Sequence, residues 1–143
     1  MKILISFITL LLMSTGSWAE QKVVEDGYEV HYNAFNSSFV TPEVAAANGL
    51  IRSKVRALVN VAVFELNDEG KTAVPVTLTG QASNLLGQMQ TITFKPIKEG
   101  DALNYIGGFR FSEAERMTIK LSVRANPAKP PIETSFTQTF YTE

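Results

Sequence analysis

One histidine is the residue best suited to acid–base or metal chemistry in this sequence. His31 follows Glu29 in a run that alternates between apolar and polar residues, so it is expected on the polar face of a strand. A serine hydrolase would have to use it, but the Gly-x-Ser-x-Gly motif that positions a nucleophilic serine does not occur. We therefore expect His31 to face solvent, and we expect His31→Ala to leave the fold and the function intact.

The other chemically capable side chains are scattered along the chain. There is no cysteine, which excludes thiol catalysis and thiolate metal sites. Met89 and Met117 are separated from His31 by whole predicted strands, and Met117 continues the apolar face of one of them. The acidic pairs at 68–69 and 99–101 lie in predicted turns beside lysines, which is typical of solvated carboxylates. We expect no catalytic residues, no metal site and no cofactor, and hence a protein that is not an enzyme.

Residues 32–56 form the one stretch whose composition favours a binding site. Aromatic residues and hydrogen-bonding side chains alternate irregularly there, and long irregular connections in compact domains are often functional. An aromatic residue next to arginine is the usual composition of an interface hot spot. The predicted contact residues are Phe39, Arg52 and Lys54, with Asn33 and Asn36 shaping the loop. The alternative is structural: Phe35, Phe39 and Leu50 would plug one end of the fold.

The elements that must hold this stretch are mostly β-strands. Alternation with a period of two predicts strands at about 28–34, 57–66, 74–82, 91–95, 103–111, 116–123 and 132–140. The strand at 57–66 is apolar on both faces, which predicts a central position. Thr41, Pro42 and Gly49 predict the start and stop of one short helix near 41–48. The pattern indicates an all-β, immunoglobulin-like antiparallel sandwich of about seven strands with one short helix.

Charge and composition exclude some partners. The 143-residue chain carries a formal net charge of −1, and its basic residues are dispersed apart from the group at 52–56. Nucleic-acid binding needs a concentrated basic patch, so nucleic acid is excluded as a partner. The same argument disfavours electrostatic attachment to an anionic membrane surface.

The first nineteen residues have the pattern of a secretory signal peptide. Lys2 precedes an apolar run over 3–13, which is too short to span a bilayer. Ser17 and Ala19 are the small residues expected before a cleavage site. We predict a signal peptide at 1–19 with the cut after Ala19, and a single β-sandwich domain at 20–143 with no integral membrane segment. An exported chain without disulfides suits a bacterial periplasm.

Four runs carry a resemblance to a known family. Residues His31–Ala47, Arg52–Lys54, Leu58–Val63 and Asn84–Gln88 are similar to a family of small exported proteins of Gram-negative bacteria that is known only as a domain of unknown function. The resemblance spans nearly all of the chain after residue 19. It implies a periplasmic address and a single domain, and it brings no activity, cofactor or catalytic residue with it.

These observations favour a non-enzymatic periplasmic binding or protein-interaction module, whose partner would be a periplasmic or envelope protein. A small-ligand carrier or an enzyme built around residues 32–56 is the alternative. A deep pocket beside Phe35 and Arg52 would favour that alternative, and a shallow apolar patch or an exposed sheet edge would favour the binding module.

The export prediction can be tested directly. Protein recovered from the periplasm should begin at Glu20, because the small residues at 17 and 19 direct the signal peptidase to that bond. N-terminal sequencing and intact mass measure this. Cytoplasmic protein that retains Met1 would contradict the prediction.

Overall fold

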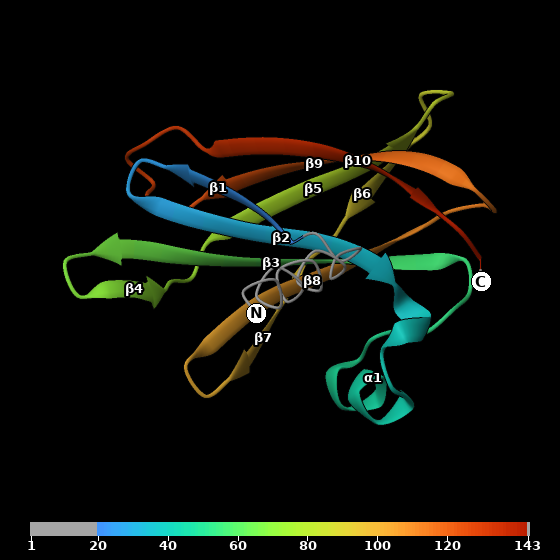
Figure 1. Cartoon of the computed structure of the whole chain (residues 1–143), viewed down its shortest axis with the longest axis horizontal. Coiled ribbons are helices and arrows are strands. Elements are labelled where there is room, and N and C mark those ends of the chain that lie inside the picture. The colour runs from blue at the N-terminus through green and yellow to red at the C-terminus, as the bar shows by residue number, and fades with distance from the viewer. Residues whose placement is uncertain (1–19, 143) are drawn as a thin grey trace, which may run out of the picture.

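The computed structural model describes residues 20–142 and shows two antiparallel sheets packed face to face (Figure 1). The predicted signal peptide at 1–19 lies outside the described residues. Sheet A contains β1 (Gln21–Glu25), β2 (Tyr28–Asn36), β3 (Arg56–Asn67), β4 (Gly70–Ala73), β7 (Lys95–Glu99) and β8 (Ala102–Arg110). Sheet B contains β5 (Thr77–Asn84), β6 (Met89–Ile92), β9 (Glu115–Arg124) and β10 (Ile132–Phe140).

The strand order confirms the immunoglobulin-like sandwich. Sheet A runs β1-β2-β3-β8-β7, and sheet B runs β10-β9-β5-β6. In the order in which they lie in sheet A, β2, β3, β8 and β7 correspond to strands A, B, E and D of the immunoglobulin fold. In sheet B, β10, β9 and β5 correspond to strands G, F and C. All seven predicted strands have a counterpart, but the strand predicted at 91–95 ends at Ile92 in β6, and residues 93–94 form the crossing to β7. The strands that the sequence did not predict, β1, β4 and β7, are short and pair on one side only. Few of their residues are therefore buried in a pattern that the sequence could reveal.

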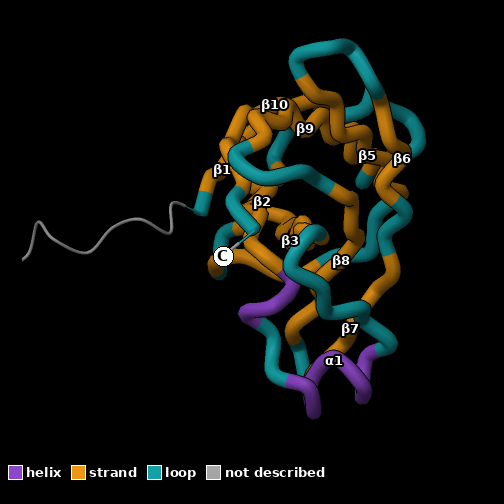
Figure 2. The backbone as a smooth tube through the Cα atoms, turned by 90° about the vertical axis from the view of Figure 1, so that its right-hand side faces the viewer, coloured by secondary structure: helices purple, strands orange, loops and turns teal. Residues whose placement is uncertain are grey.

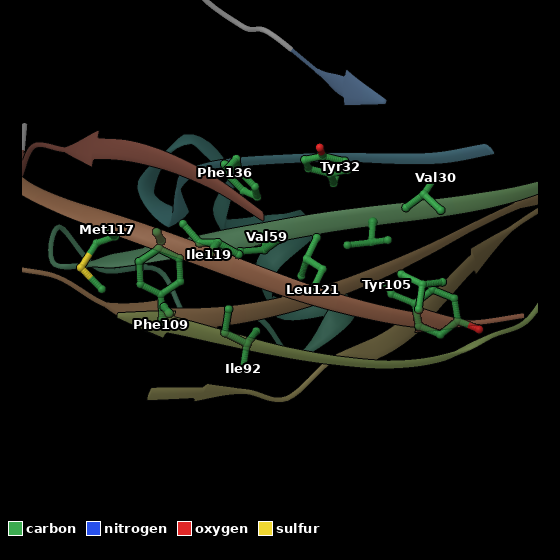
Figure 3. Close-up of a cluster of buried hydrophobic side chains, with 14 of the residues drawn as sticks. Val30, Tyr32, Val59, Ile92, Tyr105, Phe109, Met117, Ile119, Leu121 and Phe136 are labelled. Carbon is green, nitrogen blue, oxygen red and sulfur yellow. The ribbon is translucent and has the colours of Figure 1, made fainter. Parts of the chain in front are cut away.

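The core lies between the sheets and is built by side chains that alternate inward. On β3 the inner residues Val59, Val61 and Val63 are buried, and they face β9 residues such as Ile119 and Leu121 within one apolar cluster (Figure 3). Leu58 on the opposite face of β3 is also buried but does not belong to that cluster. The prediction that this strand is central and covered on both sides is therefore correct for its first half, whereas residues 65–67 are exposed.

The sheets are joined where the chain passes from β6 to β7. The missing side chain of Gly107 makes room for this crossing, because a Cβ atom there would lie 2.6 Å from both Ile92 Cγ2 and the carbonyl oxygen of Thr93. Nearby, the side-chain amide of Gln90 donates to the Arg110 carbonyl (2.7 Å) and accepts from the Arg110 amide (2.8 Å). A sheet B side chain thus completes the backbone hydrogen bonding of a sheet A strand.

Between β2 and β3 the chain forms a 3-10 turn, η3 (Ser37–Phe39), and a short helix, α1 (Pro42–Asn48). The Thr41 hydroxyl caps the helix by accepting from the Val44 amide, and Gly49 ends it in the left-handed conformation with φ of 67°. The predicted helix is confirmed. In Figure 2, α1 lies beyond β7 and β8 on the side away from sheet B, and Lys95 Nζ of β7 donates to the Asn48 carbonyl (3.0 Å).

The crossing at Gly107 predicts a position-specific loss of stability. Gly107→Ala should lower the free energy of unfolding by about 1–3 kcal/mol, the usual cost of overpacking, because a backbone carbonyl blocks the new methyl group. Gly108→Ala is the matched control, since its methyl group meets only the movable guanidinium of Arg56. Urea denaturation measures both, and equal losses would show that the crossing is not tightly packed.

Candidate functional site

Within the predicted binding stretch at 32–56, the connection between β2 and β3 covers residues 37–55. We call this connection the segment, and two serines close it at its base. The Ser37 hydroxyl donates to the Ser53 carbonyl and accepts from the Ser53 amide, each at 2.9 Å. Ser37 is fully buried, so this reciprocal pair is shielded from water. Because β2 and β3 are antiparallel neighbours, the two ends of the segment emerge side by side, where the serines can join them.

Arg52 reaches back across the segment. Its Nε donates to the Val40 carbonyl (2.6 Å), and its Nη2 donates to the Ser38 carbonyl (3.2 Å). These bonds link the strand-proximal end of the segment to the turn that carries Phe39. Arg52 is therefore a brace within the segment as well as an exposed cation. Further bonds attach the segment to the sandwich, including the one from the Phe111 amide to the Val55 carbonyl (2.9 Å).

The braced segment turns apolar side chains toward solvent. Phe39 is 57% exposed and Ile51 is 61% exposed, and Val44 and Val55 are exposed as well. Lys54, which directly precedes Val55 in the sequence, is also exposed. We call Phe39, Val44, Ile51, Lys54 and Val55 the segment surface. A rigid connection that displays several large apolar residues is typical of an interaction site.

The two predicted asparagines occupy different environments. Asn36 is buried at the end of β2, and its Nδ2 donates to the Tyr141 carbonyl (2.7 Å), which fixes the start of the segment against the end of the chain's last strand. Asn33 lies within β2 on the outer face of sheet A, directly opposite Asn60. The Oδ1 atoms of Asn33 and Asn60 are both buried and have no hydrogen-bond partner. The structure therefore groups Phe39, Arg52 and Lys54 in one segment, places Asn36 at the end of β2 where the segment begins, and places Asn33 on the sheet beside it.

Of the three residues named for the alternative role as a plug, Phe35 and Leu50 are half-buried and Phe39 is exposed. Phe35 is half-buried on the outer face of sheet A opposite the buried Leu58, and Leu50 is half-buried too. Ala45 of α1 is also buried, outside the main core cluster. The inward side of the segment thus covers sheet A while Phe39 points outward.

A second group of polar residues was not foreseen from the sequence. Glu29 is largely buried on the outer face of sheet A, where its carboxylate accepts from His31 Nε2 (2.5 Å) and from Lys71 Nζ (2.9 Å). Lys22 Nζ lies 3.9 Å from the same carboxylate, and His31 Nδ1 lies 2.9 Å from Glu20 Oε1. We call these five residues the charged cluster. Hydrogen bonds from His31 and then Lys71 lower the pKa of Glu29 to about 2.

The charged cluster changes the expectation for His31. The residue does lie on the outer face of its strand, but its side chain is only 17% exposed, so the expected solvent-facing position is not what the structure shows. Its ring stands edge-on to Phe64, with 5.5 Å between centroids, and Lys71 Nζ lies 4.9 Å from the centroid of that phenylalanine ring. Lys22 and Lys71 lie on β1 and β4, two of the strands that the sequence did not reveal, which is why the cluster was missed.

The chemistry open to this cluster is limited. Both ring nitrogens of His31 already contact carboxylates, so acting as a base or a ligand would require breaking an existing hydrogen bond. Within residues 20–142, no set of three or more histidine, aspartate and glutamate side chains is placed to hold a metal ion. Met117 is buried in the core and Met89 is exposed at a sheet edge, so the structure does not bring the methionines and the histidine together.

Comparison with known proteins places the chain in a family. Residues 22–143 match a profile described as a domain of unknown function, DUF4426. The chain belongs to the DUF4426 family. The resemblance inferred from the sequence is thereby confirmed. A crystal structure of a DUF4426 protein from Pseudomonas aeruginosa is 33% identical, with a TM-score of 0.73 over 85% of this chain and 94% of the other. Among curated proteins, none matches the chain.

More distant solved structures share only the fold. A copper-bound variant of FetP from uropathogenic Escherichia coli is 14% identical, with a TM-score of 0.61 over 86% of this DUF4426 chain and 95% of FetP. A structure of FetP expressed recombinantly in the periplasm is also 14% identical, with a TM-score of 0.60 over 87% of this chain and 95% of the other. Within residues 20–142, no helix has the length and apolar character required to cross a bilayer.

The charged cluster predicts a defined dependence of stability on pH. A glutamate whose pKa falls from 4.5 to about 2 on folding stabilises the protein above pH 4.5 and loses that contribution as the pH falls toward 2. Glu29→Gln should therefore be less stable than the natural protein at pH 7, and the difference should shrink between pH 4.5 and 2. Urea denaturation across this range measures it. A stability difference that does not change with pH would contradict the assigned ion contacts.

Proposed function

We propose that this DUF4426 protein is a non-enzymatic periplasmic binding module that recognises a periplasmic or envelope protein through the segment surface. The observation that carries the proposal is Phe39, which is more than half exposed on a segment held by the Ser37–Ser53 pair and by Arg52. A partner that contacts a partly exposed aromatic ring on a segment held by internal hydrogen bonds has no further cost of ordering the loop.

The charge of the segment surface indicates the chemistry of the partner. Lys54 is exposed, and so is Arg52 two residues before it. The single acidic residue of the segment, Glu43, lies in the first turn of α1. The partner surface should therefore be apolar at its centre and carry carboxylates at its rim. The sequence pattern at 1–19 supports a periplasmic address for this encounter, and the periplasmic expression of FetP, a protein of the same fold, is consistent with it.

We do not propose copper binding for this chain, although a FetP variant of the same fold is copper-bound. Copper sites in exported proteins use histidine and methionine side chains together. Here the thioether of Met117 is packed in the core, and the ring nitrogens of His31 contact Glu20 and Glu29. A protein-binding role therefore has more support than a copper-binding role.

Capture of partners from a periplasmic extract tests the proposal. Phe39→Ala and Lys54→Ala should each abolish capture of a protein that the natural domain retains. Lys54→Ala should change the free energy of unfolding by under about 1 kcal/mol, because that side chain is exposed. Phe35→Ala should cost more stability, since that ring is half-buried. Leu66→Ala, an exposed leucine at the end of β3, is the control and should capture normally.

Arg52 needs a separate comparison because it also braces the segment. Arg52→Ala removes two hydrogen bonds to backbone carbonyls as well as the charge, whereas Arg52→Lys keeps the charge. Capture rescued by lysine would assign the charge to the interface. Unchanged capture by the Phe39 and Lys54 variants, with stability intact, would reject the segment surface as the binding site.

A further inference from the structure

The tip of the β5–β6 hairpin displays a second apolar feature, which lies on sheet B and is distinct from the segment surface. Leu85 is 81% exposed, Leu86 is 85% exposed, and Met89 at the start of β6 is 64% exposed. We call these three residues the hairpin tip. In Figure 1 this hairpin projects beyond the body of the sandwich at the upper right. Single exposed leucines are common on soluble proteins, but two adjacent ones at a projecting turn are not explained by folding.

The hairpin tip is held in one conformation by Asn84. Its Oδ1 accepts from the amides of Leu86 and Gln88, each at 3.0 Å, and its carbonyl accepts from the amide of Gly87 at 3.0 Å. Its Nδ2 donates to Glu115 Oε2 (2.9 Å), which ties the turn to β9. Gly87 takes a positive φ of 81° that closes the turn. The leucines are therefore fixed outward.

The same bonds satisfy three backbone donors of the turn without water. Three consecutive backbone amides, those of Leu86, Gly87 and Gln88, already donate to Asn84. Backbone donors that enter hydrocarbon must be satisfied within the protein, because lipid offers no acceptor. The turn can thus leave water without stranding these donors, while both leucines gain by leaving it.

We propose that the hairpin tip inserts into the surface of a lipid bilayer. The size and shape of the feature favour lipid over a protein partner. A stable protein interface takes about 20–30 residues from each side, whereas the tip offers three large apolar side chains on a convex projection. Shallow insertion needs no complementary pocket and can be reversible. This inference uses another surface and does not depend on the proposed protein-binding function.

The charges around the hairpin tip indicate which lipids suffice. The neighbouring turn and strand carry Glu113, Glu115 and Arg116, a mixture of signs. The acids are occupied by internal bonds: Glu113 accepts from Thr142, and Glu115 accepts from Asn84 and from the Ser112 amide. Attachment should therefore rest on apolar insertion, should occur on zwitterionic lipid, and should resist salt. This agrees with a net charge of −1, which disfavours electrostatic attachment.

Vesicle flotation tests the proposal. The protein beginning at Glu20 contains both sheets and the whole described core, and it avoids the apolar run at 3–13, which would itself bind lipid. This protein should float with phosphatidylcholine vesicles equally in low and high salt. Replacing both leucines, Leu85→Ser with Leu86→Ser, should weaken partitioning at least about tenfold. The matched control, Val24→Ser with Leu66→Ser, removes two exposed apolar side chains elsewhere and should bind as the natural protein does.

A fluorescence measurement identifies the inserted residue. The single tryptophan of the chain is Trp18, so protein beginning at Glu20 has none, and Leu86→Trp introduces a unique probe. Its emission should shift to the blue on phosphatidylcholine vesicles and be quenched by brominated lipid, whereas Leu66→Trp should do neither. The proposal would be overturned if the natural protein stays unbound, if the double serine variant floats equally well, or if binding requires anionic lipid. Tip-dependent binding to a protein without any binding to vesicles would also overturn it.

Discussion

The antiparallel pairing of β2 with β3 is the constraint on which the rest of the structure depends. Their register puts Tyr32 opposite Val61 on the core side and Asn33 opposite Asn60 on the outer side, so one pairing decides the faces of both strands. It also pairs Asn36 with Ala57, so the residues that connect β2 to β3 must begin and end at the same end of the sheet. A tight hairpin of a few residues could have made this connection. The much longer segment at 37–55 is therefore additional to what the fold requires.

Two exposed apolar surfaces emerge at this same end of the sandwich. The segment surface follows β2, and the hairpin tip follows β5, and both lie on the right in Figure 1. In each surface, one polar side chain forms hydrogen bonds with backbone groups and holds the exposed residues in place. This residue is Arg52 in the segment and Asn84 in the hairpin tip. The turns at the opposite end carry mostly charged and polar residues, such as Asp68 and Asp101.

The candidate site was partly accessible from the sequence. The irregular composition of residues 32–56 pointed to the segment, and the aromatic and basic residues that it exposes, Phe39 and Lys54, were among those predicted. The structural role of Arg52 was not, because its acceptors are backbone carbonyls, which a sequence does not distinguish. Asn33 was assigned to the loop by its proximity in the chain. The strand register instead directs it to the outer face of the sheet.

The sequence predicted the elements whose formation depends on interactions between neighbouring residues. Alternation revealed the seven strands that bury one face, and Thr41, Pro42 and Gly49 marked the helix, because capping and burial act over a few neighbouring residues. Only the tertiary structure decided the edge strands β1, β4 and β7, which bury too little to leave a pattern. It also decided the contacts of Glu29 with Lys71 and the outward position of Phe39. These depend on which strands and faces meet, and residues far apart in the chain settle that together.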